Sequence, residues 1–425
     1  MDTTPFTGPH GLTRRRMLGS AMALGAAAPL GLASTARAAA SSAWAAAPSA
    51  RAESSTTRAE SPAAPGSSPQ RLTLPPPTGP YAVGTVALHL RDTSRPDPAA
   101  GPGRYRELMA SVWYPARQAD AFPLAPWLAE APLRLFLDDV GFPLPLSVAP
   151  LTAGHVGAPV HRTGRRLPVV VYAHGAHSHR GDHTVIVQEL ASHGYAVITV
   201  DLPHDAFTQF PGGPATAPSQ DPDVDTGVRA YLPDFRFVLD CVEALAAGRN
   251  PDADRRELPE GLLGALDPQR IGMFGWSKGG SVTAQTAVAD PRVRAGLSLD
   301  GPMIPAITTD LDRPFLVMTA DWPRTPDSAV ETFWTHLRGW RRTLRVEGAV
   351  HSSYGDNMTL IPQAGKLLGM TEQQIQEQVG TLDPRRGILI QQAYPLAFFD
   401  LHLRHRGGAL FDGPSPRFPE VTYLP

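Results

Sequence analysis

The stretch Gly275-Trp276-Ser277-Lys278-Gly279-Gly280 decides how this chain folds. It follows the apolar run Ile271–Phe274, which predicts a buried strand, and it precedes a run of small residues that favours a helix. A serine at such a strand-to-helix turn has a strained backbone, and glycines two positions before and after it leave room for the neighbouring chain. The pattern is typical of a nucleophile elbow with Ser277 as the nucleophile.

A serine hydroxyl is a weak nucleophile near neutral pH, so it needs a histidine base and a carboxylate that fixes the tautomer of the histidine. In folds with this elbow the chain order is serine, acid, histidine. His351 follows the predicted strand Thr343–Glu347 at its carboxyl end, where a loop can reach the site, and we predict it to be the base. The other later histidines lie in or near helical stretches and are expected to pack or face solvent: His336, His402 and His405.

Two aspartates compete for the third position. Asp300 ends the predicted strand Ala295–Leu299, and Asp321 follows the next predicted strand, Pro314–Thr319. Both follow the carboxyl end of a strand beyond Ser277, so position along the chain does not separate them.

An acyl transfer also needs amide donors for the oxyanion of the tetrahedral intermediate. One donor is expected from the residue after the nucleophile, Lys278, and the other from the loop after an earlier strand. The predicted strand Leu167–Tyr172 opens into Ala173-His174-Gly175-Ala176, so the amide of Ala176 is the second predicted donor.

A cluster of histidines, His174, His177, His179 and His183, raises the alternative of a metal site, because neutral imidazoles are common zinc ligands. Asp182 is the one conspicuous acidic neighbour. Since the elbow already accounts for catalysis, we predict neither a metal nor a cofactor.

From Tyr81 onward, β-rich runs alternate with helical stretches, which predicts an α/β fold with a mostly parallel eight-stranded sheet and flanking helices. The expected strands are Tyr81–Leu90, Leu108–Tyr114, Leu167–Tyr172, Ala196–Asp201, Arg270–Phe274, Ala295–Leu299, Pro314–Thr319 and Thr343–Glu347. The expected helices are Thr184–Ser192, Asp234–Ala247, Gly280–Ala289, Val330–Arg338 and Ile388–Leu403. Two insertions rich in proline and glycine, Asp120–Thr163 and His204–Gly227, are too long for ordinary connections and predict a lid or substrate wall.

The first 70 residues have a different composition. Residues 1–38 contain Thr13-Arg14-Arg15-Arg16-Met17-Leu18, a weakly apolar stretch and Ala36-Arg37-Ala38, which resembles a twin-arginine export signal. Residues 39–70 are rich in alanine, serine and proline and predict a disordered linker. The catalytic domain is therefore expected at 71–425, and the protein is expected to be secreted.

Composition excludes several classes of protein. The chain has 425 residues, of which 42% are hydrophobic and 18% charged, so it can bury a globular core. A net charge of −2 offers no basic face for nucleic acid, and the apolar stretch near the N-terminus is too short and weak for a stable membrane span. The single cysteine, Cys241, rules out an intramolecular disulfide.

Several motifs together resemble the plasma-type (isoform II) platelet-activating factor acetylhydrolases and their bacterial relatives, from about Tyr81 to Tyr423. They are His174-Gly175-Ala176, Leu190-Ala191-Ser192-His193-Gly194-Tyr195, the elbow, Leu299-Asp300-Gly301 and His351-Ser352-Ser353-Tyr354. The resemblance implies an α/β-hydrolase that cleaves short acyl esters from phospholipids without calcium. It also implies Asp300 rather than Asp321 as the acid, and His351 as the base. Lys278 departs from the family, where an apolar residue usually follows the nucleophile.

The expected function is that of an exported serine esterase, and the expected partner is a small-molecule ester or lipid substrate. The alternatives are a polyester or cutin hydrolase, a serine peptidase of the same fold and, without activity, a hydrolase-like binding module. The apolar residues of the first insertion suit an acyl or lipid surface: Phe122, Trp127, Leu133, Leu135, Phe136 and Phe142.

Overall fold

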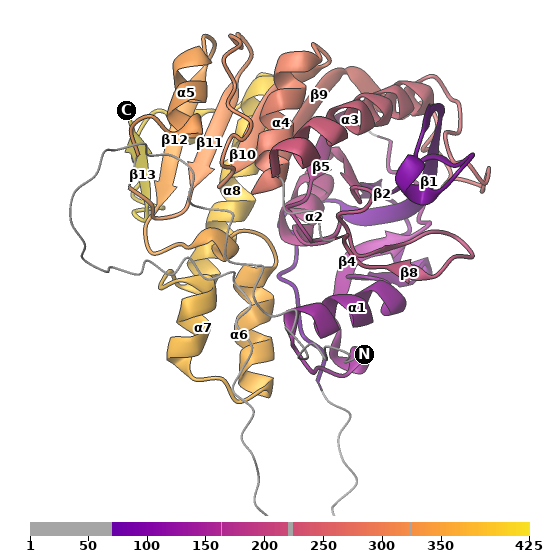
Figure 1. Ribbon diagram of the computed structural model, residues 1–425, viewed down its shortest axis with the longest axis horizontal. Helices are drawn as coiled ribbons and strands as arrows, with labels where there is room; N and C mark the ends of the chain where they lie inside the picture. The colour runs from indigo at the N-terminus through magenta and orange to yellow at the C-terminus, as the bar shows by residue number, and fades with distance from the viewer. Residues whose placement is uncertain (1–69, 163, 220–223, 324) are drawn as a thin grey trace, which may run out of the picture.

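The computed structural model describes residues 70–162, 164–219, 224–323 and 325–425. Helices flank a large twisted sheet in these residues (Figure 1). The sheet has eleven strands in the order β13-β12-β11-β10-β9-β5-β6-β2-β1-β4-β3, and β7 and β8 form a separate pair. The fold is therefore mixed α/β, as predicted.

The strands are β1 (Ala82–Pro96), β2 (Tyr105–Ala116), β3 (Leu124–Pro126), β4 (Leu151–Val156), β5 (Leu167–Ala173), β6 (Ala196–Val200), β7 (Thr208–Gln209), β8 (Ala215–Thr216), β9 (Leu266–Trp276), β10 (Val293–Leu299), β11 (Phe315–Thr319), β12 (Arg341–Val346) and β13 (Val421–Leu424). The α-helices are α1 (Glu130–Val140), α2 (Thr184–Ser192), α3 (Val224–Ala246), α4 (Lys278–Ala289), α5 (Ala329–His336), α6 (Asn357–Leu367), α7 (Glu372–Val379) and α8 (Pro384–Arg404).

All eight predicted strands are confirmed, and they form β1, β2, β5, β6 and β9 to β12. The expected count of eight was wrong, because the described residues add β3, β4 and β13 at the two edges of the sheet. These three strands are three to six residues long and lack a distinct apolar pattern. They join the sheet by pairing with neighbouring strands: β13 pairs antiparallel with β12, and β4 pairs parallel with β1.

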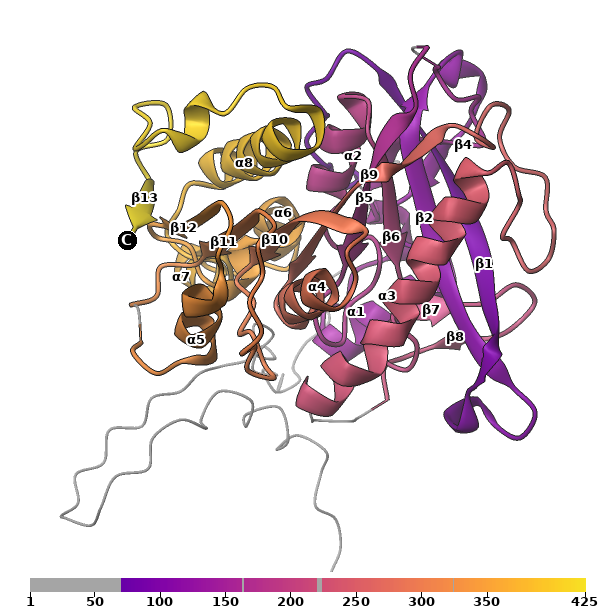
Figure 2. The same cartoon turned by 90° about the horizontal axis from the view of Figure 1, so that it is seen from above.

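The core lies on both faces of the sheet, and β5 shows why. Every residue of β5 is buried, as expected of a central parallel strand covered on two sides. Val169 and Val171 join a cluster with residues of α3, α4 and α5, whereas Val170 and Tyr172 join a cluster with residues of α2 and α8. Figure 2 shows these two helical layers on opposite sides of the sheet.

The first insertion builds structure of its own. It contributes β3 and β4 to the sheet edge and α1 between them. Trp127, Leu133 and Phe136 are buried in a third, smaller core that includes Leu360 of α6 and Phe207. A cavity of about 50 Å³, lined by apolar side chains and Asn357, lies in this region. The apolar composition of the insertion thus reflects packing in the first place.

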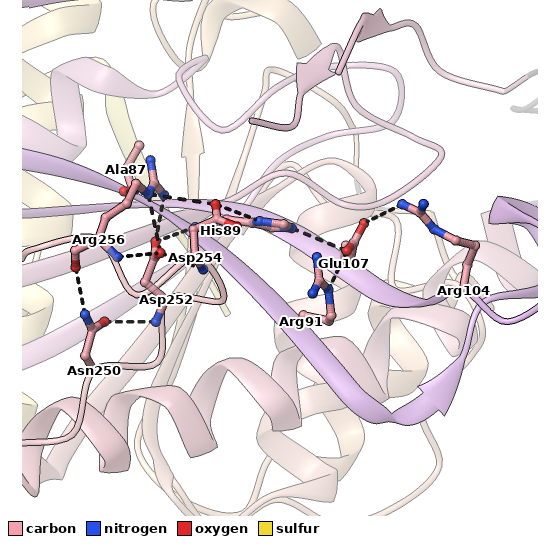
Figure 3. A network of polar contacts seen from close by, with 9 residues as sticks. All are labelled: Ala87, His89, Arg91, Arg104, Glu107, Asn250, Asp252, Asp254 and Arg256. Carbon is pink, nitrogen blue, oxygen red and sulfur yellow. Dashed lines mark hydrogen bonds and ion pairs between the residues drawn. The ribbon is translucent and has the colours of Figure 1, made fainter. Parts of the chain in front are cut away.

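The crossover between α3 and β9 is tied to the antiparallel strands by polar contacts (Figure 3). The Asp252 carboxylate accepts the His89 N–H of β1 at 3.1 Å and pairs with Arg256 at 2.6 Å. His89 Nδ1 lies 3.1 Å from Asp254. These contacts hold the loop against β1 at one side of the sheet.

Among the helices that the structure describes, none is both long and apolar enough to cross a bilayer.

Candidate active site

Ser277 sits in a tight turn between β9 and α4. Its φ and ψ are +54° and −125°, a positive φ that is uncommon for a residue with a side chain. The flanking glycines are required by close approach: a Cβ at Gly275 would lie 2.1 Å from the Gly279 carbonyl oxygen, and one at Gly279 would lie 2.0 Å from the Ala173 carbonyl oxygen. The strand, the turn and the helix expected from the sequence are all present.

The structure brings Ser277, His351 and Asp300 into one hydrogen-bonded chain. His351 Nε2 lies 2.9 Å from Ser277 Oγ, and His351 Nδ1 lies 2.6 Å from Asp300 Oδ2. A carboxylate accepts hydrogen bonds only, so Nδ1 carries the proton and Nε2 is free to accept the serine proton. The side chain of Asp300 is 6% exposed and that of His351 is 30% exposed, so the base is reachable while its partner is shielded.

Asp300 is held in place by two further donors. Its Oδ1 accepts the Ala320 N–H at 2.9 Å, and its Oδ2 accepts the Trp322 indole N–H at 3.2 Å. Asp321 has a different environment: it accepts the Gly348 N–H at 3.0 Å and its side chain is 37% exposed. The structure thus places Asp300, not Asp321, beside the histidine.

Trp276 contacts the same histidine from the elbow. Its ring stacks on the His351 ring with centroids 5.0 Å apart, and its indole N–H donates to the His351 carbonyl oxygen at 3.0 Å. The sequence gives little indication that Trp276 contacts the histidine. Its position next to Ser277 was the only signal, because the contact with His351 joins residues 75 positions apart.

The two predicted oxyanion donors lie at the ends of two elements that pack together. Lys278 is the first residue of α4, and a helix leaves its first N–H groups without an internal acceptor. Ala176 lies in the loop after β5, whose Gly175 packs so closely on the elbow that a Cβ there would lie 2.5 Å from the Trp276 ring. In the part of the chain that the structure describes, neither amide has a backbone or side-chain acceptor.

The histidine cluster does not converge on a common point. His174 Nε2 accepts the Leu202 N–H at 2.9 Å and its Nδ1 donates to the Gly175 carbonyl oxygen at 2.6 Å, so both ring nitrogens are used. Burial lowers the pKa of His179 to about 4. His183 Nδ1 lies 2.6 Å from the Tyr172 hydroxyl. Across the described ranges, no group of three or more His, Cys, Asp or Glu side chains could hold a metal ion.

Asp356 is a buried residue near the site that sequence reasoning missed. Its carboxylate accepts the N–H groups of Thr184 and Val185, which begin α2, at 3.0 and 2.8 Å, and the Trp127 indole N–H at 2.7 Å. Burial raises the pKa of this carboxyl to about 7. Asp356 follows His351 by five residues, so it anchors the histidine loop to α2 and to the first insertion.

Comparison with solved structures gives the class of protein. A ferulic acid esterase from Streptomyces cinnamoneus superposes with a TM-score of 0.70 at 30% sequence identity, covering 83% of this chain and 99% of that one. The fold and the site together define a carboxylic ester hydrolase of the α/β-hydrolase type.

The sequence comparisons give the family. The model of the family "Platelet-activating factor acetylhydrolase, isoform II" matches residues 66–207 and 254–410, so the chain belongs to this family. A probable 1-alkyl-2-acetylglycerophosphocholine esterase from Arthroderma benhamiae is 27% identical over 84% of this chain and 95% of its own length. A platelet-activating factor acetylhydrolase from Cavia porcellus is 24% identical over 78% of both chains.

Proposed function

We propose that this ester hydrolase works through Ser277 as nucleophile, His351 as general base and Asp300 as the group that orients His351. The observation that carries the proposal is the continuous contact from Asp300 through His351 to Ser277, with distances of 2.6 and 2.9 Å. Both distances lie within the reach that proton transfer requires.

The proposed reaction has two halves. His351 Nε2 takes the Ser277 proton as Oγ attacks the ester carbonyl, and the amides of Ala176 and Lys278 stabilise the oxyanion. The intermediate collapses to an acyl-enzyme, and His351 returns its proton to the leaving alcohol. Water, deprotonated by the same histidine, then attacks the acyl-enzyme, and the histidine gives this proton to Ser277 Oγ as the carboxylic acid leaves. Asp300 stays ionised throughout and stabilises the imidazolium.

For the substrate we propose short-chain acyl esters, including acetyl esters of glycerophospholipids. The support is that the family and the relatives are named as platelet-activating factor acetylhydrolases and as an alkyl-acetylglycerophosphocholine esterase. A second candidate is a hydroxycinnamoyl ester, favoured by the likeness to the ferulic acid esterase. Comparison of kcat/KM for acetyl, butyryl and octanoyl nitrophenyl esters, an acetylated glycerophosphocholine and methyl ferulate separates the two. The first proposal expects kcat/KM to fall as the acyl chain lengthens. Preference for methyl ferulate supports the second, and faster cleavage of peptide amides or long acyl chains contradicts both.

The nucleophile is tested by labelling with a fluorophosphonate and mapping the modified peptide. The label is expected on Ser277, and Ser277→Ala or His351→Ala is expected to lower kcat by about 10⁴ to 10⁶. A loss below about tenfold in a folded variant contradicts the assignment. A chelator is expected to leave the rate unchanged.

We also propose twin-arginine export of residues 39–425 after removal of residues 1–38. Residues 1–69 lie outside the described residues, so the support comes from sequence: Arg14 and Arg15, the apolar stretch after them and the small residues before residue 39. Replacing Arg14 and Arg15 by lysine is expected to leave the precursor in the cytoplasm. Unchanged secretion of that variant refutes the proposal.

A further inference from the structure

The side chain of Lys278, the residue after the nucleophile, points away from solvent. It is one of only two lysines, with Lys366, in a chain that otherwise uses arginine. Its side chain is 7% exposed, and its ammonium lies 2.8 Å from Asp205 Oδ2 and 4.9 Å from the centre of the Tyr231 ring. This compact cation leaves no room for a Cβ at Gly227 of α3, which would lie 2.6 Å from Nζ.

Asp205 faces a second partner on the other side. Its Oδ1 accepts the N–H of His177, the residue that follows Ala176, at 3.0 Å. The two loops are also joined along the backbone, where the Phe207 N–H donates to the Ser178 carbonyl oxygen at 2.9 Å. Asp205 is 3% exposed, so water does not compete freely for its oxygens.

These contacts connect the two amides that the proposed mechanism needs. Oδ2 of Asp205 pairs with the ammonium of Lys278, and the backbone N–H of Lys278 is the first proposed donor. Oδ1 accepts the backbone N–H of His177. His177 directly follows Ala176, and the backbone N–H of Ala176 is the second proposed donor. Among the carboxylates of the described residues, Asp205 is the one that contacts both segments.

We propose that Asp205 is a positioning residue that sets the separation of the Ala176 and Lys278 amides and so shapes the oxyanion hole. The inference rests on the proposed function. An oxyanion hole works because its donors are already aimed at the charge before it develops, so their spacing has to be held rigidly. A buried ion pair is a weak source of net stability, because desolvation offsets the attraction, but here the two side chains are only 7% and 4% exposed and are held in place by the packing around them. The pair of Lys278 and Asp205 therefore suits positioning better than it suits stabilising the fold.

The test compares three variants: Asp205→Asn, Lys278→Met and the double variant. Each side chain is nearly isosteric with the one it replaces. The matched control is Asp290→Asn, which weakens a half-buried pair with Arg292 (2.8 Å) at the far end of α4. This pair lies about 18 Å from the elbow for a twelve-residue helix. For each protein we would measure kcat and KM for nitrophenyl acetate, the thermal midpoint, and Ki for a trifluoromethyl ketone. Ser277 Oγ adds to the carbonyl carbon of this ketone and forms an anionic tetrahedral hemiketal, while the serine proton passes to His351.

Both single variants are expected to lower kcat about 10- to 100-fold and to raise Ki of the ketone by the same factor, with KM changed less than about threefold. Asp290→Asn should leave kcat and Ki within about threefold. The double variant leaves no unpaired buried charge, so its thermal midpoint should recover while kcat stays low.

Recovery of kcat together with stability in the double variant would overturn the proposal, as would an equal loss in the control. Failure of all three variants to fold would make the pair structural and would overturn it too. Failure of the proposed function looks different: the wild-type protein would then hydrolyse no ester, or Ser277→Ala would keep its activity.

Discussion

Asp300→Asn is expected to lower kcat by about 10³ to 10⁴ while the protein stays folded. Oδ1 of Asp300 accepts the Ala320 N–H at 2.9 Å, and an asparagine oxygen can keep that bond. The amide nitrogen then replaces Oδ2, 2.6 Å from His351 Nδ1, and puts a donor where an acceptor was. The imidazole then adopts the tautomer in which Nδ1 is unprotonated and accepts a hydrogen bond from residue 300. In this tautomer Nε2 carries the proton and cannot take the Ser277 proton.

The expected loss corresponds to about 4 to 5.5 kcal/mol of transition-state stabilisation, at about 1.4 kcal/mol for each factor of ten. Part of it comes from the Trp322 indole N–H, which donates to the same Oδ2 at 3.2 Å and would face the new amide. Asp321→Asn is the matched control. It carries the same chemical change, its oxygen can still accept the Gly348 N–H, and it has no contact with His351, so its kcat should change less than about threefold.

The assay is steady-state hydrolysis of nitrophenyl acetate by the purified proteins, with circular dichroism and the thermal midpoint as folding controls. A folded Asp300→Asn variant that loses less than about tenfold would refute the reasoning. A larger loss from Asp321→Asn than from Asp300→Asn would move the acid to the strand after β10 and would contradict the geometry of the site.

Three further results are expected. Gly279→Ala puts a Cβ 2.0 Å from the Ala173 carbonyl oxygen, so the backbone has to shift. The free energy of unfolding, measured in urea, should fall by about 3 kcal/mol or more. A fall below about 1 kcal/mol contradicts the close approach. His179 has a pKa lowered to about 4 by burial, so the unfolded chain binds more protons below pH 6.5 and stability should fall by about 3 kcal/mol as the pH drops from 6.5 to 4. His179→Asn should flatten this decline in urea titrations at both pH values, and an unchanged slope argues against the buried neutral ring. Trp276→Phe keeps an aromatic ring on His351 but loses the 3.0 Å hydrogen bond to the His351 carbonyl oxygen. The kcat should therefore fall about 3- to 10-fold at constant KM. A wild-type kcat would show that this hydrogen bond does not position the histidine.

Local backbone rules explain which parts of the fold were predictable. The eight strands and five helices expected from the sequence are present because apolar runs of β-branched residues and helical periodicity act over a few residues. The α1 helix, α6, α7 and the edge strands were not predicted. Their apolar residues are few or interrupted by proline, and what stabilises them is contact with distant segments, as when Phe136 of α1 packs near Leu360 of α6.

The sequence by itself determined the elbow, since the steric demand for Gly275 and Gly279 around Ser277 arises within five residues. It also determined His351 as the candidate base, because the order of elements along the chain leaves few histidines at strand ends. Position along the chain did not separate Asp300 from Asp321, and the family resemblance favoured Asp300, but only the tertiary structure shows Asp300 in contact with His351. Only the tertiary structure shows the Lys278 side chain directed at Asp205. The physical reason is that these contacts join residues about 50 to 75 positions apart in the chain. The register and twist of neighbouring strands set which of these residues meet, and no local sequence pattern encodes that register and twist.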